Sequence, residues 1–503
     1  MRLGALDLAV IVLYLASLSL IGVYFSRRQV SREEYLLGRR RIHWLLAAGS
    51  VVATLLSTLT YLSVPGEMIR YGLAFFTGLL GLPLAIPVVT RILLPKLTSL
   101  GITSMYEYLE QRYSAGLRRL AAAIFSVRTL TWMALVVYSC SLAVAEMTGW
   151  NLYGTIAVTG LLTTFYAAAG GLRTVIWTDN LQLWILAGGA IAIPASIWIR
   201  TGMGPAGWWE LFTQAGHADV HVFSLDPTVR LTVFSAILSQ VFWSACTQGS
   251  DQLAMQRYLA TPSLRAARRT AWAYLVLNLA VVGLLVVSGL ALFAFYYRGS
   301  GLAPAEFQRQ FAPRADTLLA RFIVEELPAG AVGLLLAALL AAAMSSFSSG
   351  INSLAAVVSG DLLTPQGRRA RDERASLRLA KAASTASGLA AVALAMLTAW
   401  AVQRTDWNLI DLSQRLNHLF VGPLAVLFFA GLLLPRVGVR AALGGFLAGS
   451  VCSVLVAFGS GWLGLARPIS FTWLVPGSFV TGFGTAMALG ALRYCKSVDG
   501  MSK

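Results

Sequence analysis

The chain has 503 residues, of which 57% are hydrophobic and 12% are charged, and its mean hydropathy is +0.70. This apolar content exceeds what a soluble domain can bury, and it excludes a soluble enzyme or a large extramembrane domain. The excess of 39 Lys and Arg over 22 Asp and Glu would suggest nucleic acid as the partner of a soluble protein, but basic residues also collect in the cytoplasmic loops of membrane proteins. We therefore expect a multi-pass protein of the cell membrane, whose partner is the lipid bilayer and not a nucleic acid.

Cysteine and histidine residues form no cluster along the sequence. Four of each are present, and none of their spacings matches a disulfide framework or a zinc site. We expect the cysteines to be reduced packing residues, and we expect neither a resident catalytic metal nor enzymatic activity.

Thirteen apolar stretches are long enough to cross a bilayer, which takes roughly 20 residues per helix. Backbone groups in lipid must be paired within their own segment, so each stretch should be a helix and the fold class should be all-α. The first stretch is too long for a removable signal peptide and lacks a cleavage site, so we expect it to remain as a span. The stretches are 3–25, 43–64, 72–95, 117–147, 152–169, 172–199, 231–252, 271–297, 329–363, 379–402, 411–434, 438–460 and 471–492.

Lys and Arg are distributed unequally between alternate connections. One set of connections, with the C-terminal tail, holds 27 of them and the other set holds 10. This ratio predicts a cytoplasmic C-terminus and an external N-terminus. The outer connections 200–230 and 298–328 should cap an outer vestibule, with short surface helices in segments such as 316–326. The basic stretch 364–381 should be a solvated loop near anionic lipid headgroups.

The second stretch contains hydroxyl side chains and helix breakers where leucine would be more favourable. Ser57, Thr58, Thr60 and Ser63 precede a Pro-Gly pair at 65–66. An unwound helix would explain them, because broken helices in transporters expose carbonyls that hold ions and substrates. The alternative is a Ser/Thr packing face that ends in a surface turn.

Three later stretches contain charged residues at membrane depth. Arg128 in the fourth needs an anion, either a substrate carboxylate or a structural partner, and both alternatives stay open. Asp179 in the sixth favours a cation partner, although it could instead reach interfacial water. Arg415, with Asn417 and His418, is interpreted as lining of the vestibule.

The seventh stretch has a second interruption at the string SACTQGSDQ (244–252), around Ser244, Thr247, Gln248 and Gly249. Two interrupted spans separated by four others indicate two halves of five helices in opposite orientation. The expected divisions are 1–42 as an extra span with its loop, 43–200 as the first repeat, 201–434 as the second repeat, and 435–503 as two further spans with a tail.

The ninth stretch carries a row of small polar residues on one helical face, formed by Ala342, Ser345, Ser346 and Ser349 at i, i+3, i+4 and i+7. A monovalent cation prefers several oxygen ligands, and hydroxyls together with carbonyls of an unwound neighbour would supply them. Close packing of helices through small residues is the alternative. The two interrupted spans favour the cation site.

Several segments of the chain, quoted below, resemble segments of the sodium:solute symporters. This family has an inverted five-plus-five helix core of the leucine-transporter fold. The stretch LLSTLTYLSVPGEMIRYG, with TSMYEYLEQRY after it, is most similar to the branch of iodide, monocarboxylate, vitamin and sialic acid carriers. The other matching strings are GGLRTVIWTDNLQ, DQLAMQRYLA, MSSFSSGINSLAAVVSGDL and FVGPLAVLFFAGLLLP.

The resemblance implies the positions of bound sodium and solute. A general sodium site would use carbonyls of Ala53, Leu56 and Ala342 with hydroxyls of Ser345 and Ser346. A second sodium site would use Asp179 with Ser345, Ser348 and Ser349, and Gln182 matches a family glutamine. The solute would lie between the second, fourth, seventh and eleventh spans, near Ser57, Thr58, Thr60, Arg128, Trp243 and Gln248.

The function expected from these features is secondary active transport, in which inward sodium flow drives uptake of a small organic solute, an anion such as a carboxylate, by alternating access. Sodium is then a co-transported ion. A proton-coupled or sodium-independent carrier is the nearer alternative, because Asp179 could titrate instead of binding sodium. A symporter-like sensor is the more distant one, since no kinase follows the last span. The sequence indicates neither the solute nor the oligomeric state.

Overall fold

The structure is a computed structural model that describes residues 3–27, 29–364, 372–402, 404, 417–462, 464 and 467–499, and every regular element among them is a helix. The predicted all-α class is confirmed. The longer helices are α1 (Ala5–Ser26), α3 (Trp44–Leu55), α4 (Thr58–Tyr71), α8 (Ala115–Thr148), α9 (Leu152–Thr201), α11 (Val233–Ser250), α13 (Leu264–Ser300), α15 (Ala315–Glu326), α16 (Ala331–Val357), α17 (Glu373–Val402), α19 (Val421–Leu433), α20 (Val439–Phe458) and α21 (Leu474–Asp499).

Short helices complete the structure. The α-helical ones are α2 (Arg32–Leu37), α5 (Gly81–Val88), α6 (Leu94–Ser99), α7 (Tyr106–Arg112), α10 (Pro205–Gln214), α12 (Gln252–Leu259) and α14 (Pro304–Phe311). Turns of 3-10 or π helix are η1 (Gly38–Arg40), η2 (Ala74–Leu80), η3 (Val89–Leu93), η4 (Ala312–Arg314), η5 (Val358–Leu362) and η6 (Phe471–Trp473).

Most predicted spans correspond to a helix. Among the described residues nine helices are long and apolar enough to cross a membrane, and the bent pair α3 and α4 makes a tenth. The stretches 152–169 and 172–199 form one kinked helix, α9, and the stretch 411–434 falls partly outside the described residues. The count of thirteen crossings therefore stays a prediction.

The kink in α9 lies at Gly171, whose φ of 60° is in the left-handed region. A Cβ at this position would lie 2.5 Å from the backbone oxygen of Tyr35. Only glycine therefore allows α9 to bend here while α2 packs against it.

The predicted break in the second stretch is present, but not at the helix breakers. α3 and α4 meet at an angle of 67°, and the two residues between them are Leu56 and Ser57. The Ser57 hydroxyl caps α4 by accepting from the Thr60 amide at 3.5 Å. Pro65 and Gly66 lie inside α4, so the expectation that they interrupt the helix is wrong. An N-cap hydroxyl, and not proline, starts the new helix.

The second break lies at Asp251, between α11 and α12. Its carboxylate accepts from the Leu253 amide at 2.9 Å and caps α12. The break lies near the end of the predicted string SACTQGSDQ (244–252), whereas Ser244 to Gly249 are the last turns of α11. The break follows a carboxylate cap and not the hydroxyl-rich segment before it.

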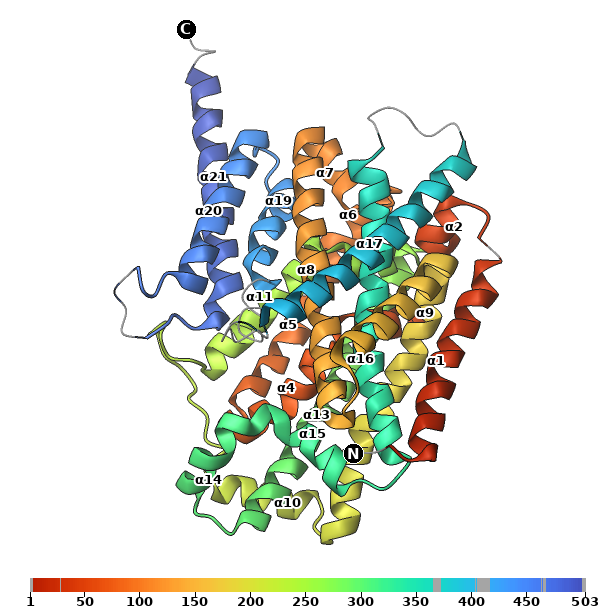
Figure 1. Ribbon diagram of the computed structural model, residues 1–503. Helices are drawn as coiled ribbons and strands as arrows, with labels where there is room; N and C mark the ends of the chain where they lie inside the picture. Colours follow the sequence, from red (N-terminus) through yellow and green to blue (C-terminus); the bar gives the residue numbers. More distant parts are fainter. Residues whose placement is uncertain are drawn as a thin grey trace.

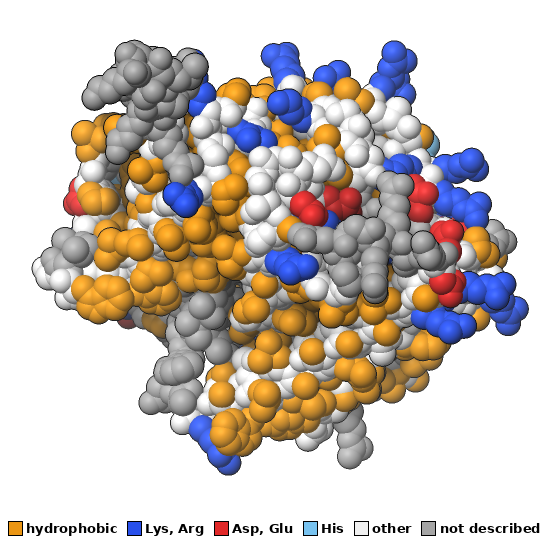
Figure 2. Space-filling view, turned by 90° about the horizontal axis from the view of Figure 1, so that it is seen from above, with side chains coloured by type: hydrophobic (Ala, Val, Ile, Leu, Met, Phe, Trp, Pro, Cys, Tyr) orange, Lys and Arg blue, Asp and Glu red, His pale blue; other side chains and the backbone are white. Residues whose placement is uncertain are grey.

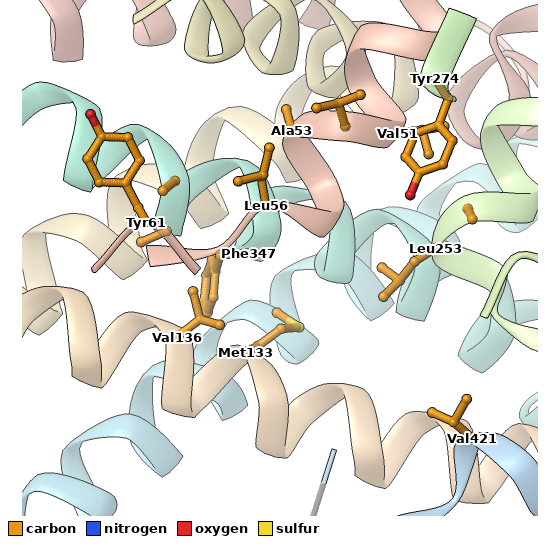
Figure 3. Close-up of a cluster of buried hydrophobic side chains, with 14 of the residues drawn as sticks. Val51, Ala53, Leu56, Tyr61, Met133, Val136, Leu253, Tyr274, Phe347 and Val421 are labelled. Carbon is orange, nitrogen blue, oxygen red and sulfur yellow. The ribbon is translucent and has the colours of Figure 1, made fainter. Parts of the chain in front are cut away.

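Helix α16 runs through the middle of the bundle (Figure 1). All of its residues except Ala331 and Leu334 are buried. Apolar side chains from neighbouring elements surround the first break, among them Leu56, Met133 and Phe347 (Figure 3). The hydroxyls of α16 and the break in the second stretch therefore lie in the apolar core of the bundle.

Short helices cover one end of the bundle, at the bottom of Figure 1, where α10, α14 and α15 lie. The expected surface helix at 316–326 is present as α15. It is attached to the end of α4 by an ion pair between Arg70 and Asp316 at 2.9 Å. α15 therefore packs against α4, the second half of the first broken span.

Candidate cation and solute sites

Hydroxyls of α16 meet carbonyls at the end of α3. The Ser345 hydroxyl donates to the Ala53 carbonyl at 2.8 Å and lies 3.3 Å from the Ala342 carbonyl, and the Ser346 hydroxyl donates to the Thr54 carbonyl at 3.0 Å. All five residues are fully buried. We call them the carbonyl cluster.

The carbonyls are available because α3 ends. In a continuous helix the Ala53 and Thr54 oxygens would accept from amides four residues later, but those amides belong to the break and to the first turn of α4. Leu56, the third expected carbonyl ligand, is the first residue of the break and is 2% exposed. Four of the five expected members are thus brought together, namely Ala53, Ala342, Ser345 and Ser346. Thr54 is an additional member that sequence reasoning missed.

A second cluster surrounds Asp179 of α9, which is fully buried. Its carboxylate accepts from Ser50 at 2.6 Å, from Ser349 at 3.2 Å and from Ser348 at 3.5 Å. Ser345 contributes less directly, through a backbone oxygen that accepts from Ser348 at 3.1 Å. We call Asp179, Ser50, Ser348 and Ser349 the aspartate cluster. Ser50 was not expected from the sequence, because it lies within α3, before the hydroxyl-rich segment that predicted the break.

Gln182, one turn beyond Asp179, has a different partner. Its side chain donates to the Tyr14 hydroxyl of α1 at 3.0 Å. It therefore connects α9 to α1, and the structure does not bring it into either cluster.

A cation already belongs to the aspartate cluster. The Arg257 guanidinium of α12 lies 3.6 Å from the Asp179 carboxylate, donates to Ser50 at 3.1 Å, and also donates to Ser349. Its exposed fraction is 0%. Arg257 is one of the 27 basic residues assigned above to the connections, but it lies in α12 and is buried, so its place in a solvated loop is wrong. The only sequence signal was its place in the string DQLAMQRYLA, six residues after an acidic cap.

Arg128 also has a carboxylate partner. It forms an ion pair with Asp251 at the second break and donates to the Asn417 side chain at 3.3 Å. The structural partner considered for Arg128 is thus present. One donor stays unused, since the Arg128 Nε–H has no hydrogen-bond partner among the residues that the structure describes.

The expected solute residues lie in two environments. Ser57 and Thr60 lie at the start of α4, and the ring of Trp243 stacks on His418 with centroids 4.2 Å apart. Gln248 is fully buried and accepts from the Tyr258 hydroxyl, while its amide nitrogen has no partner within the described part of the chain. Thr58 instead donates to the Leu339 carbonyl at 3.1 Å and so packs on α16. Arg415 lies outside the described residues.

Neither cluster resembles a resident metal centre. In the described ranges no group of three or more His, Cys, Asp or Glu side chains could hold a metal ion. One carboxylate, hydroxyls and carbonyls form a weak oxygen environment, which suits a cation that must bind and leave.

Comparison with known proteins identifies the family of the chain. The sequence model of the Sodium:solute symporter family matches residues 35–449. The sodium/sialic acid symporter SiaT of Proteus mirabilis is 30% identical over 91% of this chain and 90% of its own length. Sodium-coupled monocarboxylate transporter 1 of Homo sapiens is 30% identical over 88% of this chain and 71% of its own length.

Solved structures show the same fold. A substrate-bound, outward-open Na⁺-coupled sialic acid symporter, whose structure reveals a novel Na⁺ site, superimposes with a TM-score of 0.85 at 28% identity, over 97% of this chain and 98% of that one. The nucleobase-cation-symport transporter MHP1 has a TM-score of 0.52 at 13% identity, over 92% of this chain and 95% of that one, and shares the fold alone. The chain therefore belongs to the sodium:solute symporter family, and it is a multi-pass membrane transporter of the leucine-transporter-like fold that couples sodium flow to solute uptake by alternating access.

Proposed function

We propose that the solute is a small organic anion with a carboxylate group, and that two sodium ions accompany it. The relatives named above carry sialic acid and monocarboxylates, which both contain a carboxylate. The observation that carries the proposal is a pair of buried donors near the second break, Arg128 Nε–H and the Gln248 side-chain amide, which have no acceptor among the described residues. Buried donors normally have partners, and a carboxylate supplies acceptors.

The two sodium ions are assigned to the two clusters. The carbonyl cluster offers five neutral oxygens, three from carbonyls and two from hydroxyls. The dipoles of these groups can partly stabilise a cation without a protein countercharge. The aspartate cluster adds one formal negative charge and three hydroxyls. Both clusters contain hydroxyls of α16, so binding of one sodium ion should affect the affinity for the other.

A stoichiometry of two also determines how far the solute can be concentrated. A unit charge that crosses about 100 mV gains roughly 2.3 kcal/mol, and an assumed tenfold sodium gradient adds about 1.4 kcal/mol per ion. A monovalent anion cancels the voltage term of one ion. Two ions would then support an accumulation of roughly 10³- to 10⁴-fold.

The orientation is proposed from charge. α1 begins at the end that carries α10, α14 and α15, and α21 ends at the opposite end (Figure 1). Figure 2 looks onto that opposite end, and Lys and Arg side chains stand around it. We assign this face to the cytoplasm, so the N-terminus lies outside.

The first experiment is uptake into proteoliposomes. A panel of carboxylates is compared with the corresponding neutral amides, with sodium and with choline outside. We expect sodium-dependent uptake of carboxylates and little competition by the amides. Gln248→Leu should weaken solute binding while sodium binding stays measurable, because Gln248 belongs to neither cluster. Equal competition by amides would contradict the anionic solute.

A proton carried in addition to sodium is the second candidate, and the burial of Asp179 favours it. A carboxylate in an apolar interior can hold a proton in place of a metal ion. The same liposomes test this addition: with sodium present, an inward pH gradient should increase solute uptake if a proton is also carried, and should leave it unchanged if sodium alone is carried.

A further inference from the structure

We propose that the Arg257 guanidinium is the resident cation of the aspartate cluster, and that a sodium ion enters this cluster only by displacing it. Arg257 thereby sets the sodium affinity of the second site. The inference rests on the proposed assignment of a second sodium ion to Asp179.

The guanidinium uses the oxygens that sodium would need. The Ser50 and Ser349 hydroxyls donate to Asp179 and at the same time accept from Arg257. One lone pair of each hydroxyl oxygen is therefore occupied by an N–H group of Arg257. A sodium ion bound to the same oxygens would lie at hydrogen-bonding distance from a second full positive charge in a buried site. Simultaneous occupancy is strongly unfavourable in such a low-dielectric environment.

The charges at the second break and in the aspartate cluster balance without sodium. Arg128 pairs with Asp251, and Arg257 pairs with Asp179. These four charges sum to zero, which is the arrangement that an apolar interior favours. A sodium ion added beside Arg257 would leave one uncompensated charge, whereas a sodium ion that replaces Arg257 preserves the pairing of Asp179.

Displacement has a route through α12. The helix has only eight residues, and it follows the break at Asp251. Besides Arg257, its side-chain contact with α16 is made by Gln256, which donates to Asn352 at 2.8 Å and accepts from Ser353 at 2.9 Å. When Arg257 leaves Asp179, α12 loses one of these two polar contacts. Sodium at the second site is thus linked to the position of the inner half of this broken span.

The test measures sodium binding to the purified full-length protein in detergent without solute, by equilibrium dialysis of radioactive sodium. In Arg257→Gln the competitor is removed, so the second ion should bind about tenfold more tightly than in the unmodified protein. Arg257→Lys should lie between the two, because one ammonium cannot hold both hydroxyls in the planar geometry of a guanidinium. Arg173→Gln is the matched control: it removes the same charge from α9, six residues from Asp179, where Arg173 contacts Glu34 and Gly38.

Chemical rescue adds a second measurement. In Arg257→Ala, free guanidinium at millimolar concentration should compete with sodium and return the affinity toward that of the unmodified protein. It should have no effect in Asp179→Asn. If Arg257→Gln unfolds without salt because Asp179 has lost its partner, sodium should raise its unfolding temperature far more than that of the Arg173→Gln control.

The outcomes separate this inference from the proposed second site. If Asp179→Asn still binds as many sodium ions as the unmodified protein, the second site itself is wrong. If Asp179→Asn loses one ion but Arg257→Gln binds sodium no more tightly and guanidinium does not compete, the site stands and the displacement of Arg257 is wrong.

Discussion

The two broken spans solve the same problem with different chemistry. At the first break, between α3 and α4, the free backbone carbonyls of Ala53 and Thr54 accept from neutral hydroxyls of α16. At the second break, between α11 and α12, Asp251 and then Arg257 carry full charges, and each is paired with a different long helix. The first break therefore presents neutral oxygens. The second break is fixed by two ion pairs, to which it contributes one negative group, Asp251, and one positive group, Arg257.

This difference indicates a division of roles. Neutral oxygens stabilise a cation without a permanent counterion, so the first break can bind and release sodium reversibly. Charged groups buried in pairs are costly to separate. The helices at the second break therefore keep one arrangement until another ion replaces one member of a pair. We infer that the first break provides ligands and that the second holds the inner half-helix in place.

The largest expected effect is at the second break. Asp251→Asn leaves the Arg128 charge buried without its carboxylate, and loss of one partner of a buried pair costs roughly 3–5 kcal/mol. The unfolding temperature in detergent, or the yield of folded protein, should fall sharply. The double variant Arg128→Gln with Asp251→Asn should recover much of the loss, because no unpaired charge remains. A single variant as stable as the unmodified protein would show that the pair does not hold the break.

A smaller effect is expected at the first break. Ser345→Ala removes the hydroxyl that contacts both the Ala53 and the Ala342 carbonyls. Loss of an oxygen that binds a charged group costs roughly 1.5–3 kcal/mol, so the sodium concentration for half-maximal uptake should rise about tenfold or more. Ser141→Ala is the matched control, since Ser141 is fully buried in α8 and has no hydrogen-bond partner in the described ranges. Equal sodium dependence of the two variants would remove Ser345 from the sodium site.

The aspartate cluster contacts α3 of the first break and α12 of the second. Loss of its carboxylate should lower the cooperativity of sodium binding without abolishing transport. Asp179→Asn keeps the carbonyl cluster intact, so the sodium Hill coefficient for uptake should fall from near two to near one. Sodium titrations of initial uptake rates measure this. A coefficient of one in the unmodified protein would limit sodium binding to the first break.

The sequence predicted the first break better than the second, for a physical reason. Hydroxyls such as Ser345 and Ser346 repeat at helical spacing and reveal a face, whereas a pair such as Arg257 and Asp179 joins residues 78 positions apart, as the numbering shows. Periodicity reports on one helix at a time. It could not distinguish Arg257 from the loop arginines near it, nor find the Asp251 partner of Arg128. Similarly, Pro65 was expected to break a helix that instead begins at the Ser57 cap.

The smallest expected effect concerns the outer ends of the two spans. The C-terminal end of α4 is held by His217, whose Nε2 lies 3.1 Å from the Ile69 carbonyl, while the outer end of α11 is capped by the uncharged side chains of Thr232 and Ser235. Burial lowers the pKa of His217 below its ordinary value of 6.5, and its hydrogen bonds to backbone carbonyls oppose this only in part.

Because the folded protein holds His217 in its neutral form, the unfolded chain binds a proton more readily. The stability that His217 contributes is therefore complete above about pH 6.5 and is lost as the pH falls through the lowered pKa. Between pH 7.5 and 5 the unfolding temperature of the unmodified protein should decrease more than that of His217→Gln, which can still donate to the Ile69 carbonyl but does not titrate. Thr232→Ala should shift the unfolding temperature equally at both pH values, because its cap carries no charge. If His217→Gln keeps the full pH dependence, another group is responsible, and the outer ends of the two broken spans do not differ in their response to protons.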